Sequence, residues 1–306
     1  PVGHTAARKA SKVDGVSQVS AVRAADVSGR STWHASLQLD YTLESNRSVA
    51  RYLHNGPLRI LQSLYPEGDA VCHNVLVHPP SGLVGGDTLD MCVTVGEGAH
   101  GLVTTPGATR FYRSEAGLAT QQVHARVESD ARLEWLPLEA IAYNQCDALN
   151  RAVFDLAPDT EMMAWDLHAF RLPTADLPYV QGTFRQHLEI PGVWLERGTL
   201  NADDTRLMDS PLGLAGQRCM ATLVFASGSA MADERIERAL ACARDLLEAS
   251  ELRLSAGATS PHKQVIVLRT LSPVTEPAMQ LLRKVWAAWR HEMWALPGTY
   301  PRLWHV

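Results

Sequence analysis

Three carboxylates of this chain stand in strongly apolar stretches, where an unpaired charge is costly to bury. Asp87 ends a glycine-rich segment, Asp166 lies in the run AWDL, and Glu196 lies in the run VWLE. Burying such a group costs several kcal/mol unless it is paired, hydrogen-bonded or reached by water. Each acid therefore belongs either to a structural ion pair or turn, or to a wet path for a cation. Oxygen ligands suit the second role, because they hold a divalent transition metal weakly enough to release it.

The segment that presents Asp87 reads CHNVLVHPPSGLVGGD over residues 72–87. An apolar strand runs into a Pro-Pro stop, and Gly82, Gly85 and Gly86 then allow positive φ and a close approach of the backbone. No Gly-Lys-Ser/Thr and no helix follows, so the segment is neither a phosphate-binding loop nor a dinucleotide fingerprint. We predict a tight structural corner with Asp87 at its end.

The same segment contains potential metal ligands in Cys72, His73 and His78. On an extended strand Cys72 and His78 share one face while His73 points to the other, so one tetrahedral site is disfavoured. The pattern favours a buried thiol and hydrogen-bonded imidazoles.

Two other patterns suggest chemistry less strongly. Glu139 and Tyr143 are spaced for an acid/base pair, although an amphipathic edge strand is the commoner origin of such a run. Ser260 and Lys263 have the Ser-x-x-Lys spacing of some acyl-transfer enzymes, but the companion motifs of that chemistry are missing.

Charge and composition exclude several function classes. The net charge is −5 and no Lys/Arg-rich run is present, which argues against nucleic acid or an anionic membrane as partner. Five cysteines occur without a CxxC, which is typical of a reduced cytosolic protein. There is no apolar run of about 18 residues and no signal-peptide pattern, so we expect a cytoplasmic protein.

The hydrophobic pattern predicts a mainly β protein. Apolar and polar residues alternate over residues 33–199 in short segments broken by Gly, Pro, Asp and Asn. Residues 232–250 and 275–294 instead show helical spacing, with Thr275 as a candidate cap, and a short strand is expected at 264–268. Residues 1–30 lack a clear period and are predicted to be a flexible arm before a single domain over 31–306.

Eight motifs occur in order along residues 33–304: WHASL (33–37), GPL (56–58), YPEG (65–68), HPPSGLVGGD (78–87), TTPGATRFYRS (104–114), LEWLP (133–137), LER (195–197) and PRLW (301–304). This ordered set resembles the urease accessory protein UreD family, called UreH in some organisms. The chain departs from the family pattern at Leu138, where Gln is usual, and at Arg110, where Lys is usual. It also lacks the Gly and Glu of a Gly-Arg-x-x-x-Gly-Glu run near residues 169–180.

The resemblance implies a fold and a role. The fold is a β-helix-like body of stacked, helically wound sheets with two α-helices near the C-terminal end. The role is that of a non-enzymatic maturation factor that binds apo-urease and UreF, and the GTPase UreG through UreF, as a dimer of heteromers with UreF. No cofactor is tightly bound, because the nucleotide belongs to the partner GTPase and Ni²⁺ is in transit.

A water-filled passage for that Ni²⁺ is the site that the resemblance suggests. Asp87, Asp166 and Glu196 are its candidate acids, and Thr109 in the matching PGAT run is a candidate oxygen donor. Two alternatives remain: a β-rich hydrolase or lyase that uses Glu139, Tyr143 or Asp87, and a β-sheet adaptor with no metal role.

Overall fold

The computed structural model describes residues 32–115, 117–172 and 177–305. The expected flexible arm at 1–30 lies outside these residues, as does part of the divergent stretch near 169–180. The strands are β1 (His34–Glu44), β2 (Arg47–Asn55), β3 (Arg59–Leu64), β4 (Cys72–Val77), β5 (Gly82–Leu83), β6 (Thr88–Val95), β7 (His100–Thr104), β8 (Thr109–Phe111), β9 (Ala119–Val127), β10 (Arg132–Leu136), β11 (Ala140–Ala142), β12 (Cys146–Leu156), β13 (Glu161–Ala169), β14 (Arg171–Leu172), β15 (Leu177–Pro178), β16 (Gly182–Ile190), β17 (Trp194–Asn201), β18 (Cys219–Ser227), β19 (Ala256–His262) and β20 (Val265–Ser272). The helices are α1 (Thr205–Asp209), α2 (Asp233–Glu248), α3 (Thr275–Trp294) and the 3₁₀ turn η2 (Arg302–His305).

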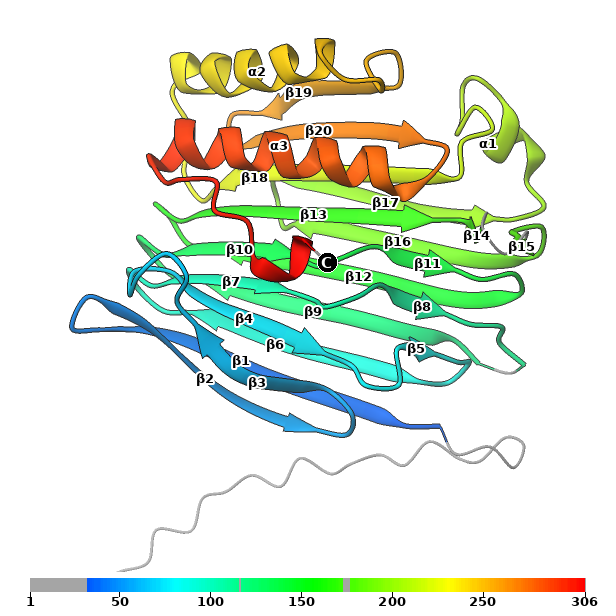
Figure 1. Ribbon diagram of the computed structural model, residues 1–306, viewed down its shortest axis with the longest axis horizontal. Helices are drawn as coiled ribbons and strands as arrows, with labels where there is room; N and C mark the ends of the chain where they lie inside the picture. The colour runs from blue at the N-terminus through cyan, green and yellow to red at the C-terminus, as the bar shows by residue number, and fades with distance from the viewer. Residues whose placement is uncertain (1–31, 116, 173–176, 306) are drawn as a thin grey trace, which may run out of the picture. The chain divides into compact units, whose positions relative to one another are not determined.

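The chain winds back and forth between two large sheets (Figure 1). Sheet A has the order β17-β16-β12-β9-β6-β1-β2, and sheet B has the order β19-β20-β18-β13-β10-β7-β4-β3. Strands β6, β9, β12 and β16 of sheet A alternate along the chain with β7, β10 and β13 of sheet B, and neighbours within each of these two sets are parallel. Short strands β5, β8 and β11 stack in parallel at one corner. This confirms the predicted helically wound β body.

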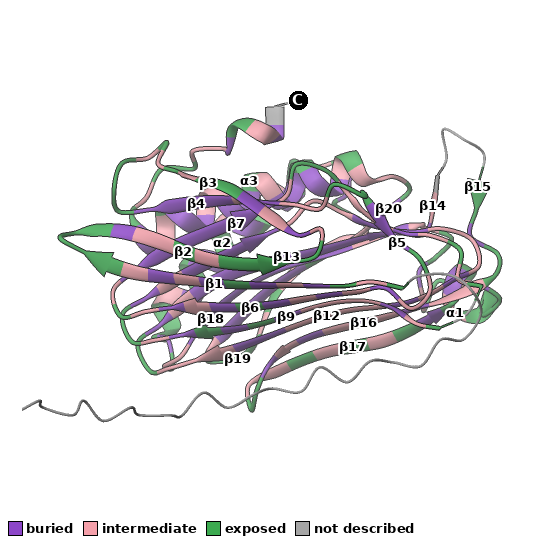
Figure 2. Cartoon of the chain, turned by 90° about the horizontal axis from the view of Figure 1, so that it is seen from below, coloured by how far each residue is buried: buried purple, intermediate pink, exposed green. Residues whose placement is uncertain are grey.

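The two sheets are buried to different extents, and the alternation of apolar and polar residues along their strands differs accordingly. In β9 of sheet A, Val123, Ala125 and Val127 are buried, while His124 and Arg126 are exposed. The central strands of sheet B are covered on both faces, by sheet A and by the layer that contains α3, so all five residues of β7 are buried. Figure 2 shows exposed residues along β1 and β2 and buried residues along β4. A strand that is buried on both faces loses the alternation of apolar and polar residues.

Helices α2 and α3 pack on the outer face of sheet B with the predicted apolar stripes. The prediction that Thr275 caps α3 is wrong, because the capping position is Val274, which makes no side-chain cap hydrogen bond. Helix α1 was not expected from the sequence, and at five residues it is too short to show a period. Among the described residues, no helix combines the length and the apolar character needed to span a membrane.

A buried ion cluster fastens α3 to sheet B. The Arg290 guanidinium is fully buried, and it lies 2.7 Å from Glu67 Oε2 and 3.2 Å from Glu134 Oε1. His73 Nε2 lies 2.7 Å from Glu67 Oε1, and His100 Nε2 lies 2.8 Å from Glu134 Oε1. Burial raises the pKa of Glu134, but the hydrogen bond from His100 and the charge of Arg290 outweigh it and hold that pKa below its usual value.

Replacing Arg290 by Met should cost about 3–5 kcal/mol in the free energy of unfolding, because it leaves two buried carboxylates without their cation. Arg238→Ala is the matched control, since Arg238 pairs with Glu292 on the surface of the two helices and is 58% exposed. That control should cost no more than about 1 kcal/mol. Urea unfolding measures both, and equal losses would contradict the assigned role of Arg290.

Candidate functional site

Three amide side chains lie at one level across sheet A. Gln121 of β9 is the register partner of Asn150 in β12, and Asn150 is the register partner of Gln186 in β16. In-register parallel strands place such residues on the same face of the sheet, one strand spacing apart. The three amides therefore form a ladder, and their contacts with sheet B show that it faces the layer between the sheets.

Hydrogen bonds join this ladder to sheet B on one side. Thr109 Oγ1 donates to Gln121 Oε1 at 3.1 Å, and Gln121 Nε2 donates to Asn150 Oδ1 at 3.1 Å. Asn150 Nδ2 donates to Asp166 Oδ1 at 3.0 Å, and His168 Nε2 lies 3.0 Å from the same oxygen. A continuous hydrogen-bonded path thus runs from Thr109 to Asp166.

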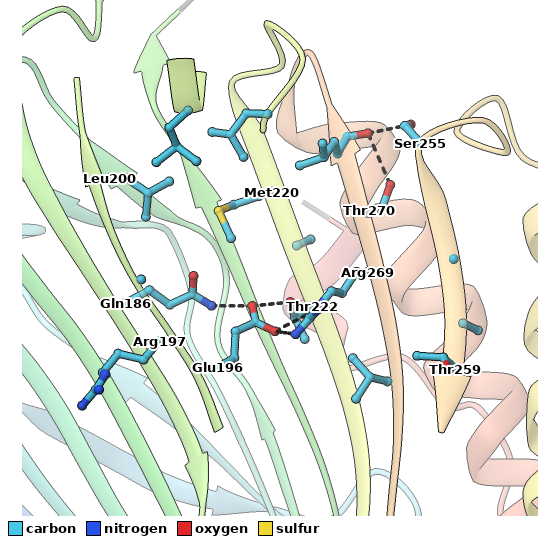
Figure 3. A pocket seen from close by; sticks show the side chains of 18 of the residues that line it. Gln186, Glu196, Arg197, Leu200, Met220, Thr222, Ser255, Thr259, Arg269 and Thr270 are labelled. Atoms are coloured by element: carbon cyan, nitrogen blue, oxygen red, sulfur yellow. Dashed lines mark hydrogen bonds and ion pairs between the residues drawn. The ribbon is translucent and has the colours of Figure 1, made fainter. Parts of the chain in front are cut away.

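At the other end of the ladder, Gln186 contacts Glu196 (Figure 3). Its Oε1 accepts from Gln186 Nε2 at 2.7 Å and from Thr222 Oγ1 at 2.9 Å. Thr222 is the register partner of Asp166, as Gln186 is of Asn150, so the two sides are adjacent. We call this set the polar row: Thr109, Gln121, Asn150, Asp166, Gln186, Glu196 and Thr222.

Three cavities follow the polar row. One of about 90 Å³ is lined by His78, Thr109 and Gln121, among others. The next, of about 20 Å³, is lined by Gln121, Asn150 and Asp166, and its size suits a single water molecule. The third is an open groove of about 670 Å³, with Gln186, Glu196 and Thr222 in its lining. Empty space and polar groups therefore follow the same line through the β body.

Asp87 lies in the corner and not in the polar row. Its carboxylate accepts from the backbone N–H of Val84 at 2.9 Å and of Trp33 at 3.3 Å. Burial raises the pKa of Asp87, although these two hydrogen bonds oppose the shift. These two hydrogen bonds close the end of the corner and connect it to Trp33.

The corner has the close approach and positive φ that the glycines suggested, at two of the three positions. A Cβ at Gly82 would overlap the ring of Tyr112, and Gly86 has φ of 91°. Within the described corner the positive φ angles occur at Ser81 and Gly86, so Gly85 is not the left-handed residue.

Cys72, His73 and His78 do not converge, as the strand geometry predicted. Cys72 belongs to the layer between the sheets, and His78 lines the cavity of about 90 Å³ in that layer. His73 instead contacts Glu67 in the ion cluster beneath α3. Among the described residues, no group of three or more His, Cys, Asp or Glu side chains is placed to hold a metal.

The remaining candidates have structural contacts. Strand β11, which follows Glu139, pairs with β8 on one side and β13 on the other, so the prediction of an edge strand is wrong. The Tyr143 ring packs on Tyr112 with centroids 4.8 Å apart. Ser260 Oγ donates to the Val265 carbonyl at 2.9 Å, and Lys263 pairs with Asp233.

His78 departs from the expected hydrogen-bonded imidazole. Its Nε2 is buried and has no hydrogen-bond partner among the described residues, and its ring packs on Trp33 with centroids 5.0 Å apart. Burial lowers the pKa of His78 from 6.5 to about 4.

The stability of the protein should therefore depend on His78 in mild acid. Because the folded pKa is depressed, this histidine stabilises the fold above the unfolded value of 6.5, and that contribution is lost as pH falls toward 4. Going from about pH 7 to about pH 5, the wild-type chain should lose about 1–2 kcal/mol more unfolding free energy than His78→Phe. Urea unfolding at both pH values measures this, and identical losses would show that His78 does not titrate as stated.

The sequence is similar to those of known proteins over most of its length. Residues 34–305 match the family model described as UreD urease accessory protein. A urease accessory protein UreD of Variovorax paradoxus is 60% identical over 273 residues, which cover 89% of this chain and 99% of the relative. The corresponding proteins of Polaromonas naphthalenivorans and Leptothrix cholodnii are 59% and 50% identical, with 90% of this chain and 100% of each relative covered. This chain belongs to the UreD family of urease accessory proteins.

Proposed function

We propose that the chain is a non-enzymatic urease maturation factor that helps deliver Ni²⁺ to the urease active site through the layer between its two sheets. Membership of the UreD family supports the role in urease maturation. The single observation that carries the passage is the polar row, which runs through the layer between the two sheets with cavities along it.

The donors of the polar row suit a metal ion in transit. They are mostly neutral amide and hydroxyl groups, and the two carboxylates, Asp166 and Glu196, supply the negative charge that attracts a cation. Carboxylate and carbonyl oxygens hold a transition metal less firmly than imidazole or thiolate does, so an ion can move from one group to the next. Of the four candidates from the sequence, we assign Thr109, Asp166 and Glu196 to the passage and Asp87 to the corner.

The competing explanation is that the acids form structural ion pairs. Asp166 does lie beside His168, and Glu196 does pair with Arg269. An ion pair alone, however, needs neither the amide ladder between the two acids nor cavities on both sides of it. Ion pairs of the Glu134–Arg290 type, which are wholly enclosed, show what a purely structural arrangement looks like in the same protein.

The proposed partners are apo-urease and UreF, with UreG bound through UreF and the assembly forming a dimer of heteromers. No tightly bound cofactor and no nucleotide site are assigned to this chain, and its place of action is the cytoplasm. A delivery factor needs an opening where cargo is exchanged, and the groove beside Glu196 offers one.

Gln121→Leu should interrupt the passage while leaving the assembly intact. Gln121 lines two of the three cavities, and leucine removes its oxygen and nitrogen at similar volume. The cost to folding should be about 1–3 kcal/mol, because Thr109 and Asn150 each lose a partner. Co-purification with urease and UreF should persist, and elemental analysis should find several-fold less nickel per urease active site.

Gln122→Leu is the matched control, since it makes the same change at the next residue of β9, on the opposite face of sheet A. Its urease should load nickel fully. Normal loading with Gln121→Leu, or an equal loss with Gln122→Leu, would contradict the passage.

A further inference from the structure

All the acceptor positions of the Glu196 carboxylate are taken. Gln186 and Thr222 donate to Oε1, while Arg269 approaches Oε2 with Nε at 2.8 Å and Nη2 at 2.5 Å (Figure 3). The guanidinium thus occupies the side of the carboxylate that a metal cation would need. A cation and this guanidinium cannot bind Oε2 together, because they compete for the same lone pairs and repel each other.

The two partners differ in their access to solvent. The Glu196 side chain, which lines the groove, is 13% exposed, whereas the Arg269 side chain is 58% exposed. An ion pair with one member this exposed is worth little, so it can open at a small cost.

The surroundings give Arg269 room to move. Its register partner in β19 is Gly257, where even an added Cβ would meet nothing within 4 Å. The Trp194 ring, two residues before Glu196 on the same strand, lies 5.8 Å from the Arg269 guanidinium carbon. The guanidinium therefore has a cation–π contact with this ring that does not depend on Glu196.

From these contacts we infer that Arg269 is a built-in competitor for the cation site at Glu196, and that a divalent cation binds this carboxylate only when the guanidinium leaves it. The inference rests on the proposed passage and names the residue that closes its groove end. Gln186 and Thr222 keep hold of Oε1 during the exchange, so Oε2 stays directed at the incoming ion.

The test is calorimetric titration of the purified full-length chain with NiCl₂, which involves no urease. Arg269→Ala should bind Ni²⁺ about two- to fivefold more tightly than wild type, the factor that corresponds to removing an exposed ion pair. Arg269→Lys keeps a cation beside Glu196 and should bind Ni²⁺ as weakly as wild type. Arg269→Gln should also bind Ni²⁺ more tightly than wild type. It replaces Arg269→Ala in the test if the alanine variant does not fold.

The double variant Glu196→Gln, Arg269→Ala should lose the gain, because the carboxylate that binds the cation is gone. The inference falls if folded Arg269→Ala and Arg269→Gln bind Ni²⁺ no more tightly than wild type, or if the double variant keeps the gain.

Nickel loading of co-expressed urease separates this inference from the proposed function. If Glu196→Gln abolishes loading while Arg269→Ala leaves Ni²⁺ affinity unchanged, the passage stands and the competitor role falls. If Arg269→Ala raises the affinity while Glu196→Gln leaves loading intact, the cation site stands and the passage falls.

Discussion

A polar side chain placed between two apolar sheets must find its hydrogen-bond partner inside that layer, because leaving it unpaired costs as much as a large core mutation. In this protein the winding of the chain supplies the partner. Each turn adds one parallel strand to sheet A in register with the last, so Gln121, Asn150 and Gln186 meet at one level. Sheet B then supplies Asp166 and Thr222 opposite them. The polar row forms because successive turns of the chain place a polar residue at the same register position of neighbouring strands.

Two kinds of buried charge result, and they differ in what surrounds them. Glu134 is fully enclosed and touches His100, Arg290 and Trp286, so its charge serves to hold α3 on sheet B. Glu196 lines an open groove, with an exposed arginine as its cation. A charge of the first kind is fixed by its partners, whereas one of the second kind can exchange its partner for another cation.

Much of the fold could be predicted from the sequence, because hydrophobic period is a local signal. The alternation before residue 199 and the two helical stripes after it gave the β body and the bounds of α3 closely. Asp166 and Glu196 stood out because each is an acid among large apolar residues. The sequence did not predict the short helix α1, and it predicted an edge strand where the enclosed strand β11 lies. Neither element is long enough to display a period.

The partners of those acids could not be predicted. Gln121 shares the face of β9 that carries Val123 and Ala125, so the alternation predicts that its side chain points inward. A single amide on a strand is nevertheless no different in sequence from a surface residue. Arg269 lies 73 residues from Glu196, and Arg290 lies 223 residues from Glu67. Which arginine meets which acid depends on strand register and helix packing over that separation, and no local pattern encodes it.

The most direct test of the central claim is anomalous diffraction at the nickel absorption edge, from crystals of the full-length chain in complex with its partners and soaked in NiCl₂. The account predicts anomalous peaks between the sheets beside Asp166 and in the groove beside Glu196, with Arg269 displaced wherever Glu196 is occupied. Peaks confined to exposed histidines, with the layer between the sheets empty at full surface occupancy, would contradict it.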